Sequence, residues 1–131
     1  MSNSKPVSTP IATGTRIIKA TDDDKLIDSK HFQSIVGSLM WAMLCTRPDI
    51  AYTIQQLSQV TSKPSEAHLQ AAKRALRYFQ GTQGKHLVFK PNGNLMSIEV
   101  QAYADADYAA DADRKSISGY LFMLAGSPIC W

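Results

Sequence analysis

Residues 96–105 alternate strictly between apolar and polar side chains, and this pattern constrains the fold more than any other part of the 131-residue chain. Alternation with a period of two predicts a β-strand with one face in a core. The apolar positions are Met96, Ile98, Val100, Ala102 and Ala104. After an acidic turn, residues 117–124 form a second apolar run, and Gly126-Ser-Pro opens a third. The pattern predicts an antiparallel sheet whose first strand ends in the carboxylate of Asp105.

Helical periodicity dominates residues 29–84. Asp28 or Ser29 is predicted to cap the first helix, whose apolar residues then recur at helical spacing from Phe32 to Met43. Gly37 and Ser38 in its middle lower helix propensity, and we interpret them as small residues that admit a neighbouring helix. Trp41 and Tyr52 are interpreted as packing residues rather than as platforms for nucleic-acid bases.

Two further helices are predicted from their end signals. In Thr46-Arg-Pro-Asp, Thr46 is a candidate cap, Pro48 suits a first turn and Asp49 complements the helix dipole. A third helix is predicted over residues 65–79, with Gly81 as its C-terminal cap. Three helices with short connections can bury one another's apolar faces, so this stretch is predicted to be a compact helical unit.

Composition bears on the N-terminal segment, the partners and the cellular location of the chain. Residues 1–28 are rich in Ser, Thr, Pro and Asp, which predicts an extended or mobile lead-in. The net charge of +3 permits a nucleic-acid partner without requiring one. Cys45 and Cys130 lie in apolar runs, so they are expected to be reduced and buried, and their spacing does not suit a metal. The sequence predicts neither a signal peptide nor a membrane span, which favours an intracellular location, cytoplasmic or nuclear.

The third helix carries the strongest signal for nucleic-acid binding. At about 100° per residue, Leu69, Ala72, Leu76 and Phe79 share one face, and the basic residues gather on a separate flank. The flank is formed by Lys73, Arg74 and Arg77. Cations at this spacing can contact successive phosphates. A solvated charged face near the helix C-terminus, where the dipole favours basic residues, is the alternative. Arg47 is a weaker candidate, with a purely structural role as the alternative.

Five motifs, in order and at characteristic spacings, resemble the Pol polyprotein of copia-type retrotransposons. They are Lys5-Pro-Val-Ser-Thr-Pro-Ile, Ile35-Val-Gly-Ser-Leu-Met-Trp, Thr46-Arg-Pro-Asp-Ile-Ala-Tyr, Ala72-Lys-Arg-Ala-Leu-Arg-Tyr-Phe-Gln-Gly-Thr and Ala104-Asp-Ala-Asp-Tyr-Ala-Ala-Asp. The resemblance implies an α+β chain: a lead-in over 1–28, a three-helix unit like the thumb or connection of reverse transcriptase over 29–84, and the truncated, incomplete start of a ribonuclease H-like antiparallel sheet over 85–131.

The resemblance also implies one catalytic residue. Ribonuclease H uses several carboxylates to hold two Mg²⁺ ions, and the family motif aligns Asp105 with a metal ligand at the end of the opening strand. Asp107 is a weaker second ligand, whereas Asp111 and Asp113 are interpreted as a solvated acidic turn. The catalytic Glu and later Asp of the family are expected beyond Trp131, so we expect neither tight Mg²⁺ binding nor hydrolysis by this chain.

Two functions therefore compete. The first is a fragment of a reverse transcriptase/ribonuclease H polyprotein that at most binds an RNA–DNA hybrid or template–primer duplex, because the chain lacks a Tyr-x-Asp-Asp polymerase motif. The second is a non-enzymatic helical module that binds protein. Other expected partners are the remainder of Pol and a second copy, through an apolar sheet face that lacks its covering helices. The residues expected to be short of partners are Val100, Phe122, Leu124 and Trp131.

Overall fold

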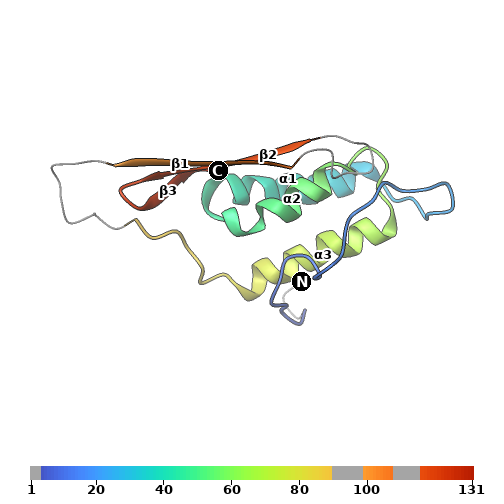
Figure 1. The fold of residues 1–131 in the computed structure, drawn as a ribbon. Coiled ribbons are helices and arrows are strands. Elements are labelled where there is room, and N and C mark those ends of the chain that lie inside the picture. The colour runs from blue at the N-terminus through green and yellow to red at the C-terminus, as the bar shows by residue number, and fades with distance from the viewer. Residues whose placement is uncertain (1–3, 90–98, 108–115) are drawn as a thin grey trace. The chain divides into compact units, whose positions relative to one another are not determined.

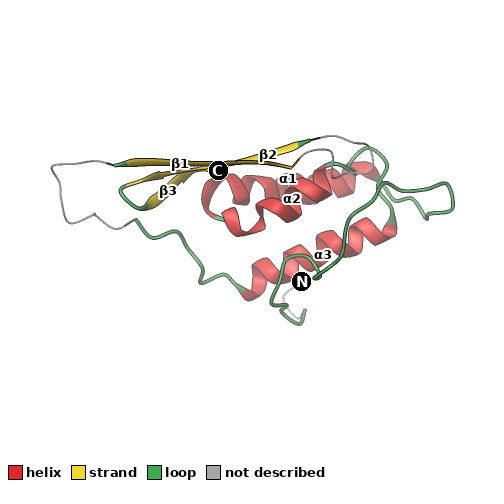
Figure 2. Ribbon diagram, viewed as in Figure 1, coloured by secondary structure: helices red, strands yellow, loops and turns green. Residues whose placement is uncertain are grey.

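The computed structural model describes residues 4–89, 99–107 and 116–131 of the protein. The chain divides into two compact units, Met1–His86 and Leu87–Trp131 (Figure 1). Among these described residues, the first unit contains three α-helices and a short 3-10 helix, and the second contains three antiparallel strands (Figure 2). The predicted α+β class is confirmed. No helix in the described ranges is long and apolar enough to cross a membrane.

Local capping signals explain where the helices begin and end. Helix α1 (Ser29–Thr46) follows Asp28, whose carboxylate accepts hydrogen bonds from the backbone N–H groups of Lys30 and His31. The 3-10 helix η1 (Pro48–Ile50) has Pro48 at its first position, and α2 (Ala51–Ser58) follows directly. The prediction that Thr46 caps this second helical segment is wrong, because Thr46 is the last residue of α1 and no side chain caps η1.

Helix α3 (Glu66–Gly81) starts with a reciprocal cap. The Ser65 side chain accepts from the backbone of His68, and the backbone N–H of Ser65 donates to His68 Nδ1 at 3.0 Å. His68 Nε2 lies 2.8 Å from the carbonyl of Ile18. Since Nδ1 accepts a hydrogen bond, Nε2 carries the ring hydrogen and donates a hydrogen bond to that carbonyl. His68 therefore joins the start of α3 to the N-terminal segment.

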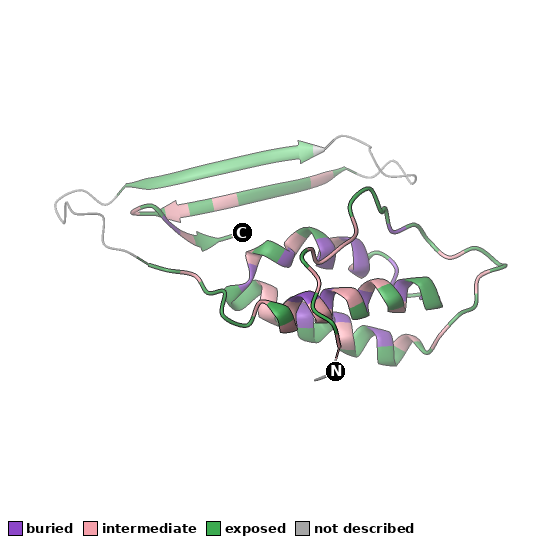
Figure 3. Ribbon diagram, turned by 90° about the horizontal axis from the view of Figure 1, so that it is seen from below, coloured by how far each residue is buried: buried purple, intermediate pink, exposed green. Residues whose placement is uncertain are grey.

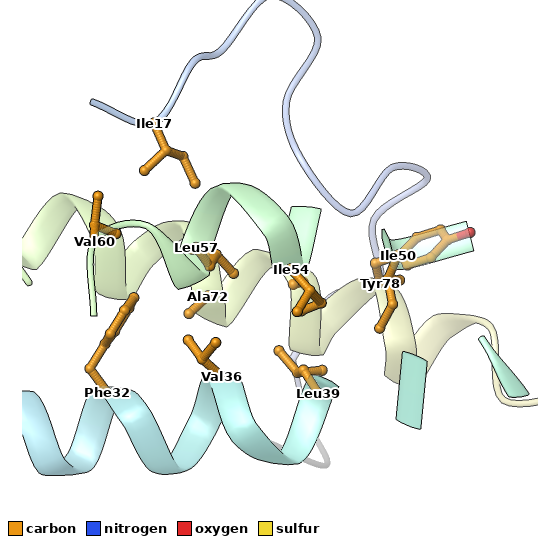
Figure 4. Close-up of a cluster of buried hydrophobic side chains, with 11 residues drawn as sticks. Ile17, Phe32, Val36, Leu39, Ile50, Ile54, Leu57, Val60, Ala72 and Tyr78 are labelled. Atoms are coloured by element: carbon orange, nitrogen blue, oxygen red, sulfur yellow. The ribbon is translucent and has the colours of Figure 1, made fainter. Parts of the chain in front are cut away.

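The core lies between the three helices. Phe32, Val36 and Leu39 point from α1 towards α2 and α3 (Figure 4). The other buried apolar residues are Ile17, Ile50, Ile54, Leu57, Val60, Ala72, Ala75 and Tyr78. Full burial of a Leu, Ile or Phe side chain contributes about 1.5–3 kcal/mol relative to exposure. Figure 3 shows that buried positions concentrate on the helices.

Four residues expected inside the core are exposed instead. Trp41 is 71% exposed and Tyr52 is 60% exposed. Each lies two positions from a buried residue, Leu39 or Ile54, so about 200° of helical rotation turns it away from the core. The expectation that both pack inside is wrong. Cys45 and Cys130 are free thiols, as predicted, but both are exposed.

The lead-in is an extended segment that packs on the helical unit. We name residues 4–28 the N-terminal strap. Ile17 is buried, and Val7, Ile11 and Ile27 are partly buried against the core. At its end the strap pairs with the turn before α3, where Ile27 N–H donates to the Pro64 carbonyl and Glu66 N–H donates to the Lys25 carbonyl. These contacts attach the strap to the helices of the first unit, although the strap itself forms neither a helix nor an extended sheet.

The second unit is a meander with the order β1-β2-β3. Strand β1 (Val100–Asp107) pairs antiparallel with β2 (Ile117–Leu124), which pairs antiparallel with β3 (Ser127–Cys130). Ala125 and Gly126 both have positive φ, which suits a two-residue turn of the type that matches strand twist. The predicted hairpin and third strand are confirmed. Positions 96–98 and the turn with Asp111 and Asp113 lie outside the described residues.

One face of this sheet exposes apolar side chains. The register places Val100 opposite Leu124 and Ala102 opposite Phe122, so these residues share a face. Val100, Phe122 and Leu124 are all exposed, and Trp131 is half-buried. The centre of the Phe122 ring lies 5.9 Å from the centre of the Tyr120 ring. Self-association through this face stays a prediction.

The interpretation of Gly37 and Ser38 as a close helix contact is wrong within the described part of the chain. Both residues are exposed, and a Cβ placed on Gly37 meets no atom within 4 Å. The Ser38 hydroxyl donates to the Ser34 carbonyl, one turn earlier in α1. Gly37 therefore weakens α1 without helping it to pack.

We expect Gly37→Ala to raise the free energy of unfolding of the helical unit by about 0.5–1 kcal/mol, because alanine loses less backbone entropy than glycine in a helix. Urea unfolding followed by circular dichroism at 222 nm measures the change. A loss of stability would show that another surface covers this face of α1 in solution.

Candidate nucleic-acid interface

Helix α3 packs through a wider arc than its sequence pattern predicted. Its buried residues are His68, Ala72, Ala75 and Tyr78. Leu69, Leu76 and Phe79 are half-buried and pack against the same core. The predicted face was therefore incomplete, since α3 contacts α1 and α2 on one side and the N-terminal strap on another.

The basic flank of α3 is present, but its three cations have different surroundings. Lys73 is exposed, whereas Arg74 and Arg77 are half-buried. Arg74 Nη2 donates to the Thr9 hydroxyl at 2.9 Å, and Arg77 Nε donates to the Lys5 carbonyl at 2.8 Å. Arg74 Nε is buried without a hydrogen-bond partner in the described structure. Two of the predicted nucleic-acid contacts therefore also hold the strap.

The strap follows α3 in the opposite direction along almost its whole length. Near the end of the helix, the Ser4 hydroxyl donates to Gln80 Oε1, and Pro6 lies against Gly81. Near its start, Ile18 meets His68 and Lys25 meets Glu66. The sequence pattern did not predict this arrangement. The available signal was a set of isolated apolar residues, Val7, Ile11 and Ile17, in a polar segment.

Arg47 is a buried structural residue, which settles its two alternative roles. Its side chain is 5% exposed and pairs with Asp49 through two hydrogen bonds, from Nε to Oδ1 and from Nη2 to Oδ2, both 2.8 Å long. Nη2 also donates to the Thr82 hydroxyl at 2.7 Å, and Nη1 donates to the Thr82 carbonyl at 3.3 Å. The guanidinium stacks 4.6 Å from the centre of the Phe79 ring. Such a group cannot reach a phosphate.

The same network includes the end of α3. Tyr78 O–H donates to Asp49 Oδ2 at 2.7 Å, and Lys85 Nζ donates to the Tyr78 oxygen at 3.1 Å. The hydrogen bonds from Arg47 hold the pKa of Asp49 below its ordinary value, with a further lowering by Tyr78 against the opposing effect of burial. Asp49 is therefore a carboxylate across the physiological pH range.

Asp105 lies in β1 opposite Gly119, and its side chain is exposed. Its Oδ1 accepts a hydrogen bond from the backbone of Ala106 at 2.9 Å. Asp107 continues the strand opposite Ile117. Within the described ranges, no three His, Cys, Asp or Glu residues lie close enough to hold a metal ion. The described residues therefore do not fit a two-Mg²⁺ site, and weak binding at Asp105 and Asp107 stays a prediction.

Comparison with known proteins identifies the origin of the chain. No protein-family model and no solved structure matches it. It is 42% identical over 137 residues to the Retrovirus-related Pol polyprotein from transposon TNT 1-94 of Nicotiana tabacum, covering 100% of this chain. It is 43% identical over 132 residues to the corresponding polyprotein from transposon RE1 of Arabidopsis thaliana, again covering 100% of this chain.

The chain belongs to the copia-type retrotransposon Pol family. The resemblance seen in the five ordered motifs is confirmed. This Pol chain spans 10% of the tobacco polyprotein and 9% of the RE1 polyprotein. It is also 45% identical over 101 residues to Secreted RxLR effector protein 161 of Plasmopara viticola, a match that covers 76% of this chain and 69% of that protein.

In this Pol chain we expect Asp49→Asn to lower the free energy of unfolding by about 1–2 kcal/mol at neutral pH, since a charge-assisted pair at a partly exposed carboxylate is lost. The folded-state pKa of Asp49 is lowered, so the pair stabilises fully above the unfolded pKa of about 4 and less as pH falls further. The difference between variant and wild type should therefore shrink below that pH.

Urea unfolding at a series of pH values measures this dependence, and Asp23→Asn, at an exposed acid of the strap, is the matched control. A difference that stays constant down to pH 2 would contradict the ionised pair.

Proposed function

We propose that this chain is the thumb or connection region of a copia-type Pol polyprotein, joined to the first strands of a ribonuclease H-like domain, and that its helical unit binds an RNA–DNA hybrid or template–primer duplex. One observation carries the proposal. A helix with an apolar face on the core presents a basic flank in a chain that matches Pol polyproteins over its whole length.

Phosphate contacts are the chemistry that this flank supports. Lys73 is exposed and reaches solvent directly, and it lies one turn from Arg77 on the same helix. Lysine and arginine contacts to phosphate release counterions, so binding weakens steeply with salt. They carry no sequence information, which suits an element that must slide along any template.

The sheet contributes the start of a second site. By family resemblance, Asp105 corresponds to the first metal-binding carboxylate of a ribonuclease H domain. In the parent enzyme, bound Mg²⁺ would activate the attacking water. The Asp105 side chain is exposed, and among the described residues no three His, Cys, Asp or Glu side chains lie close enough to hold a metal ion. We therefore expect no hydrolase activity from this chain by itself. The remainder of Pol is the partner that supplies the other carboxylates.

We expect Lys73→Ala to weaken binding to a hybrid duplex equally for different sequences, and to reduce the slope of log affinity against log salt by about one. Fluorescence anisotropy across a salt series measures both. Lys30→Ala is the control, because it removes the same charge from an exposed position of α1, and it should change the slope less.

Lys73 gives a cleaner test than the full set, because Arg74 and Arg77 also hold the strap. The triple replacement of Lys73, Arg74 and Arg77 by Ala should flatten the slope further, with folding checked by circular dichroism. If the triple variant keeps the wild-type slope, the interface is elsewhere. A protein complex insensitive to all three changes would instead indicate the interaction module.

We expect no cleavage of an RNA–DNA hybrid by the wild-type chain with Mg²⁺ or Mn²⁺, because one carboxylate cannot hold two ions. Gel analysis of an end-labelled RNA strand provides the measurement. Cleavage that persists in Asp105→Asn would come from a contaminant. Metal-dependent cleavage that disappears in this variant would show that a complete site exists and would contradict the proposal.

A further inference from the structure

The two arginines of the basic flank are already engaged by neutral oxygen atoms of the strap. Arg77 Nε donates to the Lys5 carbonyl, and Arg74 Nη2 donates to the Thr9 hydroxyl. A phosphate oxygen is a charged acceptor and forms a stronger bond with a guanidinium than either of these groups does. An N–H group that points at the strap cannot point at a duplex at the same time. Strap and phosphate therefore compete for the same donors.

The strap contains a natural division between a releasable and an anchored part. Residues 4–11 contact α3 through Ser4, Pro6 and the two arginine bonds, with Val7 and Ile11 partly buried. Further along, Ile17 is buried and the Ile18 carbonyl accepts from His68. Release that stops at the anchored part exposes Val7 and Ile11 but leaves Ile17 in the hydrophobic core.

We infer that residues 4–11 of the strap are an intramolecular competitor for the basic flank, and that a nucleic-acid backbone displaces them from Arg74 and Arg77. The inference rests on the proposed function and adds a regulatory step to it. In the closed state Lys73 makes the first contact with a duplex. In the open state Arg74 and Arg77 add theirs, so affinity depends on how firmly the strap is held.

Gly81 provides a variant that loosens the strap without touching a cation. A Cβ at Gly81 would lie 2.6 Å from the Cβ of Pro6, closer than real contacts allow, so Gly81→Ala must move this end of the strap. Gly84→Ala is the matched control, since a Cβ there meets nothing within 4 Å. Thr9→Val is a second loosening variant, because it removes the oxygen that accepts from Arg74.

The experiment measures the affinity of each full-length variant for an RNA–DNA hybrid by anisotropy, and follows the methyl groups of Val7, Ile11 and Ile17 by NMR. We expect Gly81→Ala and Thr9→Val to bind about two- to tenfold more tightly, the equivalent of one or two hydrogen bonds, and Gly84→Ala to match wild type. Saturating duplex should shift the Val7 and Ile11 methyl signals of the wild-type chain but not those of Ile17.

Two results would overturn the inference while the proposed function stands, provided that Lys73→Ala still weakens binding. The first is a Gly81→Ala variant that binds the hybrid no more tightly than wild type, although its Val7 and Ile11 methyl signals show that residues 4–11 have left α3. The other is a wild-type strap whose methyl signals ignore saturating duplex. Absence of binding by the wild type and both loosening variants would remove the proposed function and the inference together.

Discussion

The pair formed by the buried Arg47 and the partly exposed Asp49 is the interaction that joins the elements of the helical unit. A guanidinium that is 5% exposed is tolerated only when its charge and its donors are satisfied, and here Asp49 and Thr82 accept from Nε, Nη1 and Nη2. Tyr78 ties the same carboxylate to α3. The end of α1, the start of η1 and the end of α3 are thereby held at one point.

The packing of the helical unit in turn decides what its basic residues can do. Arg47, Arg74 and Lys73 are all cations in a mildly basic chain, yet one is inside, one holds the strap and one is exposed. Charge count does not distinguish these roles. Burial and partners do, because a buried guanidinium whose N–H groups point at protein oxygens cannot reach a phosphate.

In the sheet, the alternation of apolar and polar residues predicts the two faces of a strand but not what covers them. Its period correctly placed Val100 and Ala102 on one face and Asp105 on the other, because side chains alternate along any strand. It did not show what covers the apolar face, where Val100 and Phe122 are exposed. Coverage depends on other segments, and so does a two-metal site, whose carboxylates must converge from several elements.

Local chemistry was therefore determined by the sequence: the Asp28 cap, Pro48 at the start of η1, and the turn at Gly126, each of which depends on a few adjacent residues. Tertiary structure decided the rest. The strap contact between Lys5 and Arg77 joins residues 72 positions apart, and the contact between Arg47 and Thr82 joins residues 35 apart. Trp41 is exposed, and a Cβ on Gly37 would meet no atom of the described residues within 4 Å, because of how α1 is oriented. A periodic pattern predicts that a helix has faces, but only the packing of distant segments decides which atoms those faces meet.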